Sequence, residues 1–253
     1  MTTDDGKRDA FGAALRTVEA AAERDISLRL IGGQGVRYLT PEFPPRARDD
    51  QDMDFASVSR TSGDLLRFFS DLGFSADERF NALHGRSQMF FSTPDGRTSV
   101  DVVMDELRMC HVLDFRERID RQPHTLDVVD LLLSKLQVVE LNAKDAHDIV
   151  YLLAAFQVRE GDEVGTIGLG RFGEVLGGDW GWWRTVTANL DAMAEDLASG
   201  RIQGPEGARF DPEEQARRLR AHADAVPKSL RWKLRARIGD RVRWYELPEE
   251  VAH

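Results

Sequence analysis

The chain has 253 residues, 42% of them hydrophobic, which is enough for one large core or two modest domains. Its 34 basic and 44 acidic residues give a net charge of −10, which excludes global tuning for DNA or an anionic membrane. A single cysteine, Cys110, excludes an intrachain disulfide and a multi-cysteine zinc site.

Targeting segments are not recognisable in the sequence. No apolar run approaches the roughly 18 residues that a membrane helix needs. The N-terminus, MTTDDGKRDA, is polar and lacks the apolar stretch of a signal peptide. We therefore expect a cytoplasmic protein without a membrane partner.

The first elements are predicted from apolar spacing. Apolar residues three and four apart predict a helix over 7–24, and alternation over 26–31 predicts a half-buried strand. Gly32 and Gly33 end that strand. A second helix is predicted after the glycines, ending at the prolines of 41–45, because proline cannot continue a helix.

A strand, a helix and a hairpin are predicted next. Residues 51–58 read as a strand, and 62–74 as a short helix in which Gly73 suits a left-handed C-terminal cap. Two β-rich runs within 87–104 flank a Pro-Asp-Gly turn, which predicts a hairpin.

The character changes to helix after about residue 122. Apolar stripes predict helices over 125–141, with Thr125 as N-cap, and over 144–158. Amphipathic segments without a convincing strand follow over 165–243, and the tryptophan-rich stretch 179–183 is expected in a helical core. The predicted fold class is α+β.

The domain prediction follows from the same change of character. We predict an α/β domain over 1–122 and a helical domain over 123–253.

Three aspartates on predicted strands are the candidate chemical site. Asp52 and Asp54 are two residues apart on one strand, so they share a face opposite Met53, at a separation that suits ligands of one or two metal ions. Asp101, on the hairpin, could complete such a site or accept a proton from an attacking hydroxyl. Solvated carboxylates on half-buried strands would give the same pattern.

The glycine turn supplies a candidate phosphate seat. A strand that ends in Gly32 and Gly33 and opens a helix presents backbone N–H groups at the positive helix end. Arg48 adds a cation close to the carboxylates. A plain tight turn, and an Arg48 that pairs with Asp49 or Asp50, are the alternatives.

A basic segment, 228–243, stands out near the C-terminus. Seven of its residues are cationic and only Asp240 is acidic. Leu230, Leu234 and Ile238 recur every fourth residue, which predicts a helix held by that face with arginines on the other. Its anionic partner would be tRNA, a nucleoside triphosphate or an acidic protein surface. Pairing of the arginines with acids of neighbouring helices is the alternative.

The order of these parts resembles the nucleotidyltransferase superfamily. The matching features are strand, Gly-Gly and helix, then Arg-x-x-x-Asp-x-Asp, then a helix and a hairpin with a third aspartate. More closely, the chain resembles the bacterial branch that includes the AbiEii-type toxins, over roughly residues 20–158. The resemblance implies a small mixed sheet flanked by helices, followed by a helical bundle.

The resemblance also implies roles for residues. Asp52, Asp54 and Asp101 would be catalytic and would hold Mg²⁺ or Mn²⁺. The nucleotide would be bound by residues that match the family's glycine turn, arginine, lysine helix and Lys-Asp-x-x-Asp helix: Gly32, Gly33, Arg48, Lys135, Lys144, Asp145 and Asp148. The implied reaction moves a nucleoside monophosphate from a triphosphate to an acceptor hydroxyl, and an antitoxin protein is an implied partner.

Four functional readings remain open, the weakest being a glycosyltransferase reading of the Asp-x-Asp pair. The first is a toxin-like enzyme that acts on tRNA or a protein, which the basic segment favours. The second modifies a small molecule of the aminoglycoside or lincosamide type. The third is an inactive binding module, because Gln34 and Asp50 stand where the family has a small residue and a threonine.

Overall fold

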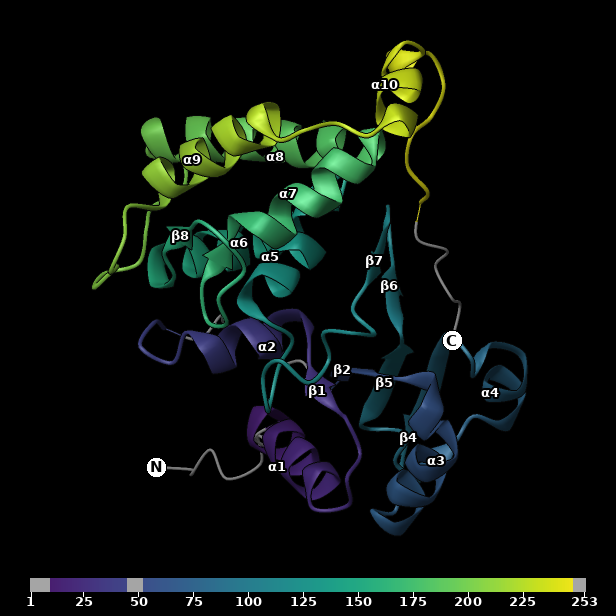
Figure 1. Cartoon of the computed structure of the whole chain (residues 1–253). Helices are drawn as coiled ribbons and strands as arrows, with labels where there is room; N and C mark the ends of the chain where they lie inside the picture. The colour runs from purple at the N-terminus through teal and green to yellow at the C-terminus, as the bar shows by residue number, and fades with distance from the viewer. Residues whose placement is uncertain (1–9, 45–51, 248–253) are drawn as a thin grey trace. The chain divides into compact units, whose positions relative to one another are not determined.

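The computed structural model describes residues 10–44 and 52–247, and its contacts divide the chain into two units (Figure 1). The described part of the first unit consists of 10–35, 52–106 and 114–126, and that of the second of 36–44, 107–113 and 127–247. Two short segments from the first half of the sequence thus belong to the second unit. The domain limits 1–122 and 123–253 stay a prediction about parts that fold independently.

The first unit is built on a small mixed sheet, which confirms the predicted α+β class. The strand order is β1-β2-β5-β4-β3; β2 and β5 are parallel, and the other neighbours are antiparallel. The strands are β1 (Arg29–Leu30), β2 (Met53–Ser57), β3 (Ser75–Ala76), β4 (Gln88–Ser92) and β5 (Ser99–Met104). The predicted hairpin is the β4–β5 pair, with Gly96 at positive φ in its turn.

One face of this sheet is apolar and covered by helices. Met53, Phe55, Val100 and Val102 are buried there, as the alternation predicts. Phe69 of α3 packs its ring 4.5 Å from that of Phe91 and 6.3 Å from that of Phe55. Helix α1 also contacts β1 and β2. The opposite face carries the aspartates.

The helices of the first half follow the predictions with shifted limits. They are α1 (Ala10–Ala22), α2 (Gly32–Leu39), α3 (Ser62–Asp71) and α4 (Glu78–His84). Helix α2 begins at Gly32 itself, and Gly73 has the predicted left-handed conformation, with φ of 85°. Helix α4 was not predicted; Asp77 caps it by accepting from the N–H of Phe80.

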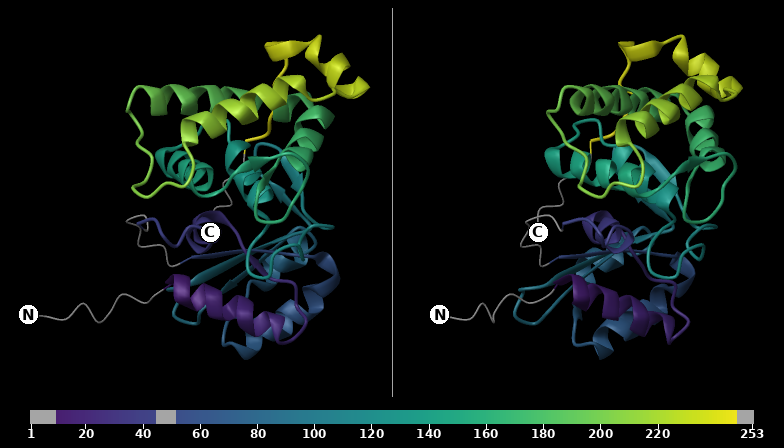
Figure 2. Two further views of the ribbon diagram at one scale, coloured as in Figure 1. Left: turned by 60° about the vertical axis from the view of Figure 1, so that its left-hand side comes forward. Right: turned by 90° about the vertical axis from the view of Figure 1, so that its left-hand side faces the viewer.

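The second unit is largely helical, and its helices α8 and α9 run side by side (Figure 2). Its elements are β6 (Glu106–Arg108), β7 (Val112–Asp114), α5 (Val128–Leu136), α6 (Ala143–Ala155), β8 (Val158–Arg159), β9 (Ile167–Gly168), α7 (Leu169–Gly178), α8 (Trp180–Ala198), α9 (Pro212–Ala225) and α10 (Leu230–Ala236). Trp180 and Trp182 are buried, as expected for a helical core.

Two details of this unit correct the predictions. The N-cap of α5 is Asp127, whose carboxylate accepts from the N–H of Val128, whereas the hydroxyl of Thr125 donates to the carbonyl of Leu126. The helix therefore starts later than the apolar pattern suggested. A two-residue strand, β9, also lies in the stretch expected to contain none.

The basic segment packs by a different face than predicted. Helix α10 covers only 230–236, and Leu230, Leu234 and Ile238 are 74%, 52% and 45% exposed. The helix rests instead on Trp232, whose ring lies 5.3 Å from that of Trp183. Aromatic packing displaced the leucine stripe because it buries more surface per residue.

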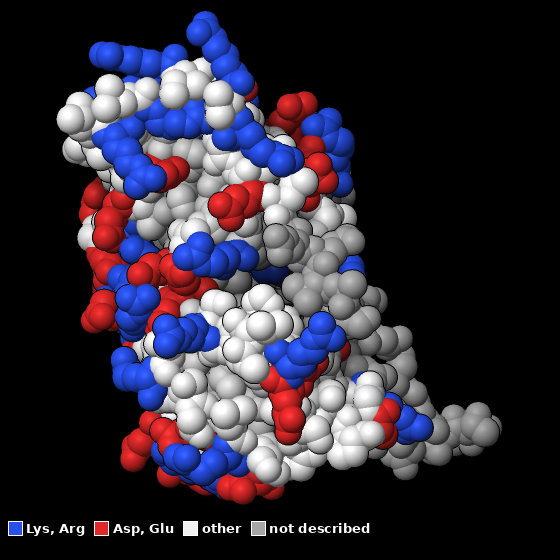
Figure 3. Space-filling view, turned by 90° about the vertical axis from the view of Figure 1, so that its right-hand side faces the viewer, with Lys and Arg blue, Asp and Glu red and all other residues white. Residues whose placement is uncertain are grey.

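The exposed face of this segment therefore mixes cations with aliphatic side chains. Figure 3 shows lysines and arginines gathered among uncharged residues at its top, over α10. Arg231, Lys233, Arg237 and Arg241 are exposed there.

None of the described helices combines the length and the apolar character needed to cross a membrane.

Candidate active site

Asp54 and Asp101 lie directly opposite each other on neighbouring parallel strands. Asp54 of β2 is the register partner of Asp101 of β5. Register partners in a sheet point to the same face, so both carboxylates project from the face that the helices α1 and α3 leave open. Asp54 is exposed and Asp101 is half-buried. Two like charges side by side favour a cation between them.

Neutral side chains donate hydrogen bonds to the carboxylates of Asp52 and Asp101 on this face. The hydroxyl of Ser99 donates to Oδ1 of Asp52, just before β2 begins. The side-chain amide of Gln88 on β4 donates to both oxygens of Asp101, at 2.8 and 2.7 Å. Asp52 therefore continues the row of acids that Asp54 and Asp101 begin.

The glycine turn lies against this row. Gly32 has φ of 59°, and a Cβ at that position would lie 2.9 Å from Oδ2 of Asp54. The turn is tied to β2 by the N–H of Ile31, which donates to the carbonyl of Asp54, and by Nε2 of Gln34, which donates to the carbonyl of Asp52. Only a glycine lets the backbone approach the carboxylate this closely.

The N-terminus of α2 therefore opens beside a carboxylate. Gly33 lies in the first turn of this helix, directly after Gly32. The free N–H groups of a first helical turn favour anions, including phosphate. The turn lies next to Asp54, and its role as a phosphate seat stays a prediction.

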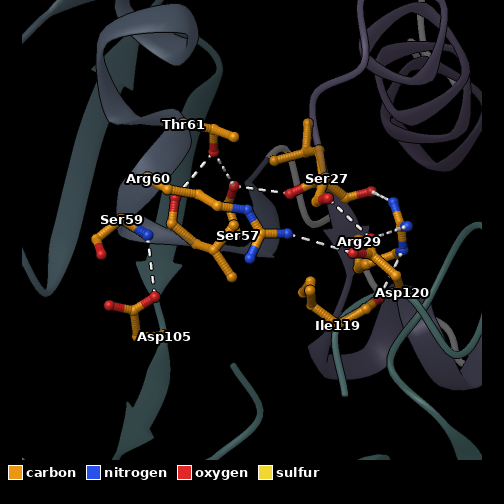
Figure 4. Close-up of polar contacts among 11 residues, drawn as sticks. Ser27, Arg29, Ser57, Ser59, Arg60, Thr61, Asp105, Ile119 and Asp120 are labelled. Atoms are coloured by element: carbon orange, nitrogen blue, oxygen red, sulfur yellow. Dashed lines mark hydrogen bonds and ion pairs between the residues drawn. The ribbon is translucent and has the colours of Figure 1, made fainter. Parts of the chain in front are cut away.

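A polar network fixes the carboxyl ends of β2 and β5 (Figure 4). The hydroxyl of Ser57 donates to the carbonyl of Ser27, and the N–H of Ser59 donates to Asp105, which follows β5. Buried Arg29 pairs with Asp120 at 2.9 Å. Burial lowers the pKa of Arg29, and the charge of Asp120 opposes that shift. The network connects the two acid-bearing strands at their carboxyl ends.

The donor set can be compared with what a divalent cation requires. Asp54 and Asp101 offer hard carboxylate oxygens, which Mg²⁺ and Mn²⁺ take together with water and phosphate oxygens. Among the described residues, no group of three or more His, Cys, Asp or Glu side chains is arranged to hold a metal ion by itself. The set therefore fits a cation that arrives with the phosphates of a nucleotide, not a closed protein cage.

The remaining predicted nucleotide ligands lie elsewhere in the chain. Arg48 lies outside the described residues. Lys135 of α5 pairs with Asp145 at 2.7 Å and with Asp148 at 3.0 Å, both on α6. Lys144 is exposed on the first turn of α6. Roles for these residues in nucleotide binding stay predictions.

Sequence reasoning missed Gln88 and Ser99. Both lie on the hairpin whose alternation was recognised, and both share the face of Asp101. Counting residues from Asp101 along β5 and across to β4 would have placed them there.

A cleft of about 720 Å³, lined by residues such as Leu66, Leu83 and Met89, contains none of the three aspartates.

Comparisons with known proteins give distant structural likenesses only. No protein-family profile and no curated sequence matches the chain. The antibiotic-resistance factor ANT(2'')-Ia is 12% identical, with a TM-score of 0.41, over 75% of this chain and 94% of its own.

Two further solved structures are similar at the same level. An antigenic nucleotidyltransferase-like protein from Paracoccidioides brasiliensis is 12% identical, with a TM-score of 0.44, over 87% of this chain and 94% of its own. A nucleotidyltransferase of H. pylori, described as putative, is 13% identical, with a TM-score of 0.36, over 89% and 95%. These values are too low to establish the fold or activity of this chain.

Proposed function

We propose that this chain is a nucleotidyltransferase that moves a nucleoside monophosphate from a nucleoside triphosphate to an acceptor hydroxyl. The observation that carries the proposal is the register of Asp54 and Asp101 on the open face, with the Gly32 turn against Asp54. This combination places an anion seat beside a carboxylate pair. A carboxylate pair alone would be a solvated surface feature.

The proposed chemistry requires positioning and charge stabilisation. The acceptor oxygen forms a bond to the α-phosphorus, the bond to the bridging oxygen breaks, and pyrophosphate leaves with the electron pair. Asp101 takes the acceptor proton, and the turn at Gly32 and Gly33 receives the β- and γ-phosphates. A cation, Mg²⁺ or Mn²⁺, that arrives with the phosphates and is held by Asp54 together with Asp52 or Asp101 would offset the phosphate charge.

We propose a polyanionic or protein acceptor of the toxin-like kind, tRNA being the first candidate. The exposed cations of 231–241 support this choice, because they create a local basic surface on an acidic chain. The resemblance to AbiEii-type toxins adds an antitoxin protein as a partner. An aminoglycoside-type acceptor and a binding module without transfer are the competing proposals.

A labelling experiment distinguishes these proposals. The chain is incubated with each α-³²P-labelled nucleoside triphosphate and Mg²⁺, with total RNA, protein lysate and an aminoglycoside pool as separate acceptors. We expect label in the RNA pool, and its loss in the Asp54→Asn and Asp101→Asn variants. The matched control is Asp64→Asn, an exposed acid that pairs with Arg67 on the surface of α3.

Each outcome has a defined meaning. Label in the aminoglycoside pool alone would replace the proposed acceptor, and label that survives in both variants would reject the site. If no pool is labelled, calorimetric titration of nucleotide with Mg²⁺ decides between a binding module and no nucleotide site.

A further inference from the structure

Gln88 makes a contact with Asp101 whose orientation is chemically fixed. Its Nε2 lies 2.8 Å from Oδ1 and 2.7 Å from Oδ2 of that carboxylate. An ionised carboxylate only accepts hydrogen bonds, so the amide must present its NH₂ group and not its carbonyl. One amide nitrogen thus lies within hydrogen-bond distance of both oxygens of one acid.

The hairpin register brings this amide to the site. Gln88 is the register partner of Val103, and Phe90 is the partner of Asp101. Residues 88 and 90 therefore share the face of Asp101, and Gln88 reaches it diagonally across the β4–β5 pair. The contact depends on strand pairing, which leaves Gln88 little freedom to drift.

We propose that Gln88 is a positioning residue that orients the carboxylate of Asp101 toward Asp54 and a divalent cation. The proposal rests on the proposed function. A carboxylate offers about four lone-pair sites, and Gln88 occupies one on each oxygen. Gln88 approaches Asp101 from the side of β4, whereas β2 with Asp54 lies on the opposite side of β5.

The neutrality of Gln88 is part of its role. A lysine or arginine at this position would also orient Asp101, but its charge would cancel the attraction of the acid pair for a cation. An amide donates to Asp101 without adding a charge, so the net negative charge of the acid pair is not reduced. Partners of this kind behind a metal ligand typically change metal affinity by about 10–100-fold when removed.

A second side-chain amide, bound to the same sheet, provides the matched control. The side chain of Asn81 of α4 donates to the carbonyl of Phe90 and accepts from its N–H, so it joins the helix to β4 by backbone groups and not through a carboxylate. Replacing Asn81 tests what an amide contributes to the structure of this edge. Replacing Gln88 tests what an amide contributes to Asp101.

The experiment measures Mn²⁺ affinity of the full chain by electron paramagnetic resonance, with and without a non-hydrolysable nucleoside triphosphate. The variants are Gln88→Met, close to the shape of glutamine, Gln88→Thr, which favours a strand, Asp101→Asn and Asn81→Ala. We expect roughly a tenfold or greater loss for both Gln88 variants and a larger loss for Asp101→Asn. Asn81→Ala should stay within about twofold of the parent while lowering the unfolding midpoint.

The outcomes separate this inference from the proposed function. If the parent chain binds no Mn²⁺ even with nucleotide, the metal site and the proposed function fail together. If Asp101→Asn loses affinity while both Gln88 variants match the parent, the positioning role is rejected and the site stands. If Asn81→Ala loses as much affinity as Gln88→Met at equal folded fraction, the effect is structural, which also rejects the positioning role.

Discussion

At the scale of single residues, Gly32 shows how backbone conformation and chemistry meet in this site. Its positive φ and its distance to Asp54 are separate reasons for a glycine. Gly96, in the β4–β5 turn, has a similar φ of 64°, but a Cβ there would meet nothing within 4 Å. Both positions therefore require a left-handed backbone conformation, but only at Gly32 would a side chain meet a neighbouring residue.

We predict that Gly32→Ala and Gly96→Ala each lower the free energy of unfolding by about 1–2 kcal/mol, the cost of a left-handed conformation. Only Gly32→Ala should also weaken Mn²⁺-dependent nucleotide binding, because its methyl group displaces the carboxylate of Asp54. Urea unfolding followed by circular dichroism and a nucleotide titration check the two parts. Equal nucleotide affinity in both variants would remove Gly32 from the site.

The residue scale also shows what the sequence predicted about the site. The shared face of Asp52 and Asp54 followed from alternation alone, because a strand has only two faces. The place of Asp101 opposite Asp54 depends on the register of β2 and β5. The approach of Gly32 to Asp54 did not, since it depends on how β1 pairs with β2. The hydrogen bonds that Gln88 donates to Asp101 and Ser99 donates to Asp52 depend on strand register in the same way.

At the scale of elements, Lys135 joins α5 to α6. It is 12% exposed and pairs with Asp145 and Asp148, which are 15% and 2% exposed. The family resemblance assigns Lys135 to the nucleotide, which stays a prediction; the two ion pairs indicate that Lys135 also stabilises the second unit. A buried carboxylate that loses its cation is strongly destabilising.

We predict that Lys135→Met lowers the free energy of unfolding of the second unit by about 3–5 kcal/mol. Lys144→Met, nine residues further along and exposed, should change it by less than about 0.5 kcal/mol. Tryptophan fluorescence during urea unfolding checks this, because all five tryptophans lie at 180–244 in that unit. A small effect of Lys135→Met would mean that water replaces the lysine.

Helix α10 shows why an apolar stripe can mislead. Periodicity identified Leu234 as part of a packed face, but the structure packs Trp232 and leaves Leu234 52% exposed. The pattern carries no information about which neighbouring element offers a matching surface. Here Trp183 of α8 provides that surface, and Trp232 packs against it. The packed face of a longer helix such as α6 was predicted more accurately, because several of its turns are buried and its apolar pattern depends less on a single neighbour.

We predict that Leu234→Ser changes the free energy of unfolding by less than about 0.5 kcal/mol. Trp232→Ala should lower it by about 1–2 kcal/mol, less than a fully buried tryptophan would, because Trp232 is only half-buried. Thermal unfolding of the two variants checks the order. A larger loss for Leu234→Ser would restore the leucine face as the packed one.

At the scale of the whole molecule, the fold class was predictable, whereas the assignment of short segments such as 107–113 to a unit was not. Strand and helix periodicities specify the α+β class, since each follows from local spacing. The short segment 107–113 belongs with the helical unit because of contacts such as that between His111 and Thr185, 74 residues apart. Contacts across such distances leave no local pattern in the sequence.

His111 makes the stability of the second unit depend on pH. It is buried, its Nε2 lies 2.8 Å from Oγ1 of Thr185, and burial lowers its pKa to about 4, against the opposing charge of Asp179. The unfolded chain binds a proton near pH 6.5, whereas the folded unit resists it. Stability is therefore complete above pH 6.5 and falls as the pH drops toward 4.

We predict a loss of up to about 1.4 kcal/mol per pH unit within this window, because one proton separates the two states. His111→Gln, which keeps a polar side chain without a titrating ring, should lower stability at pH 7.5 and remove the slope between pH 6.5 and 4. Urea unfolding followed by tryptophan fluorescence at several pH values measures both. An unchanged slope in His111→Gln would assign the acid sensitivity to another group. The carboxyl of Asp105 does not account for the loss of stability between pH 6.5 and 4. Burial would raise its pKa, but hydrogen bonds from Ser59 and the charge of Arg116 outweigh burial and hold the pKa below its ordinary value. The contribution of Asp105 to stability is therefore lost only at lower pH.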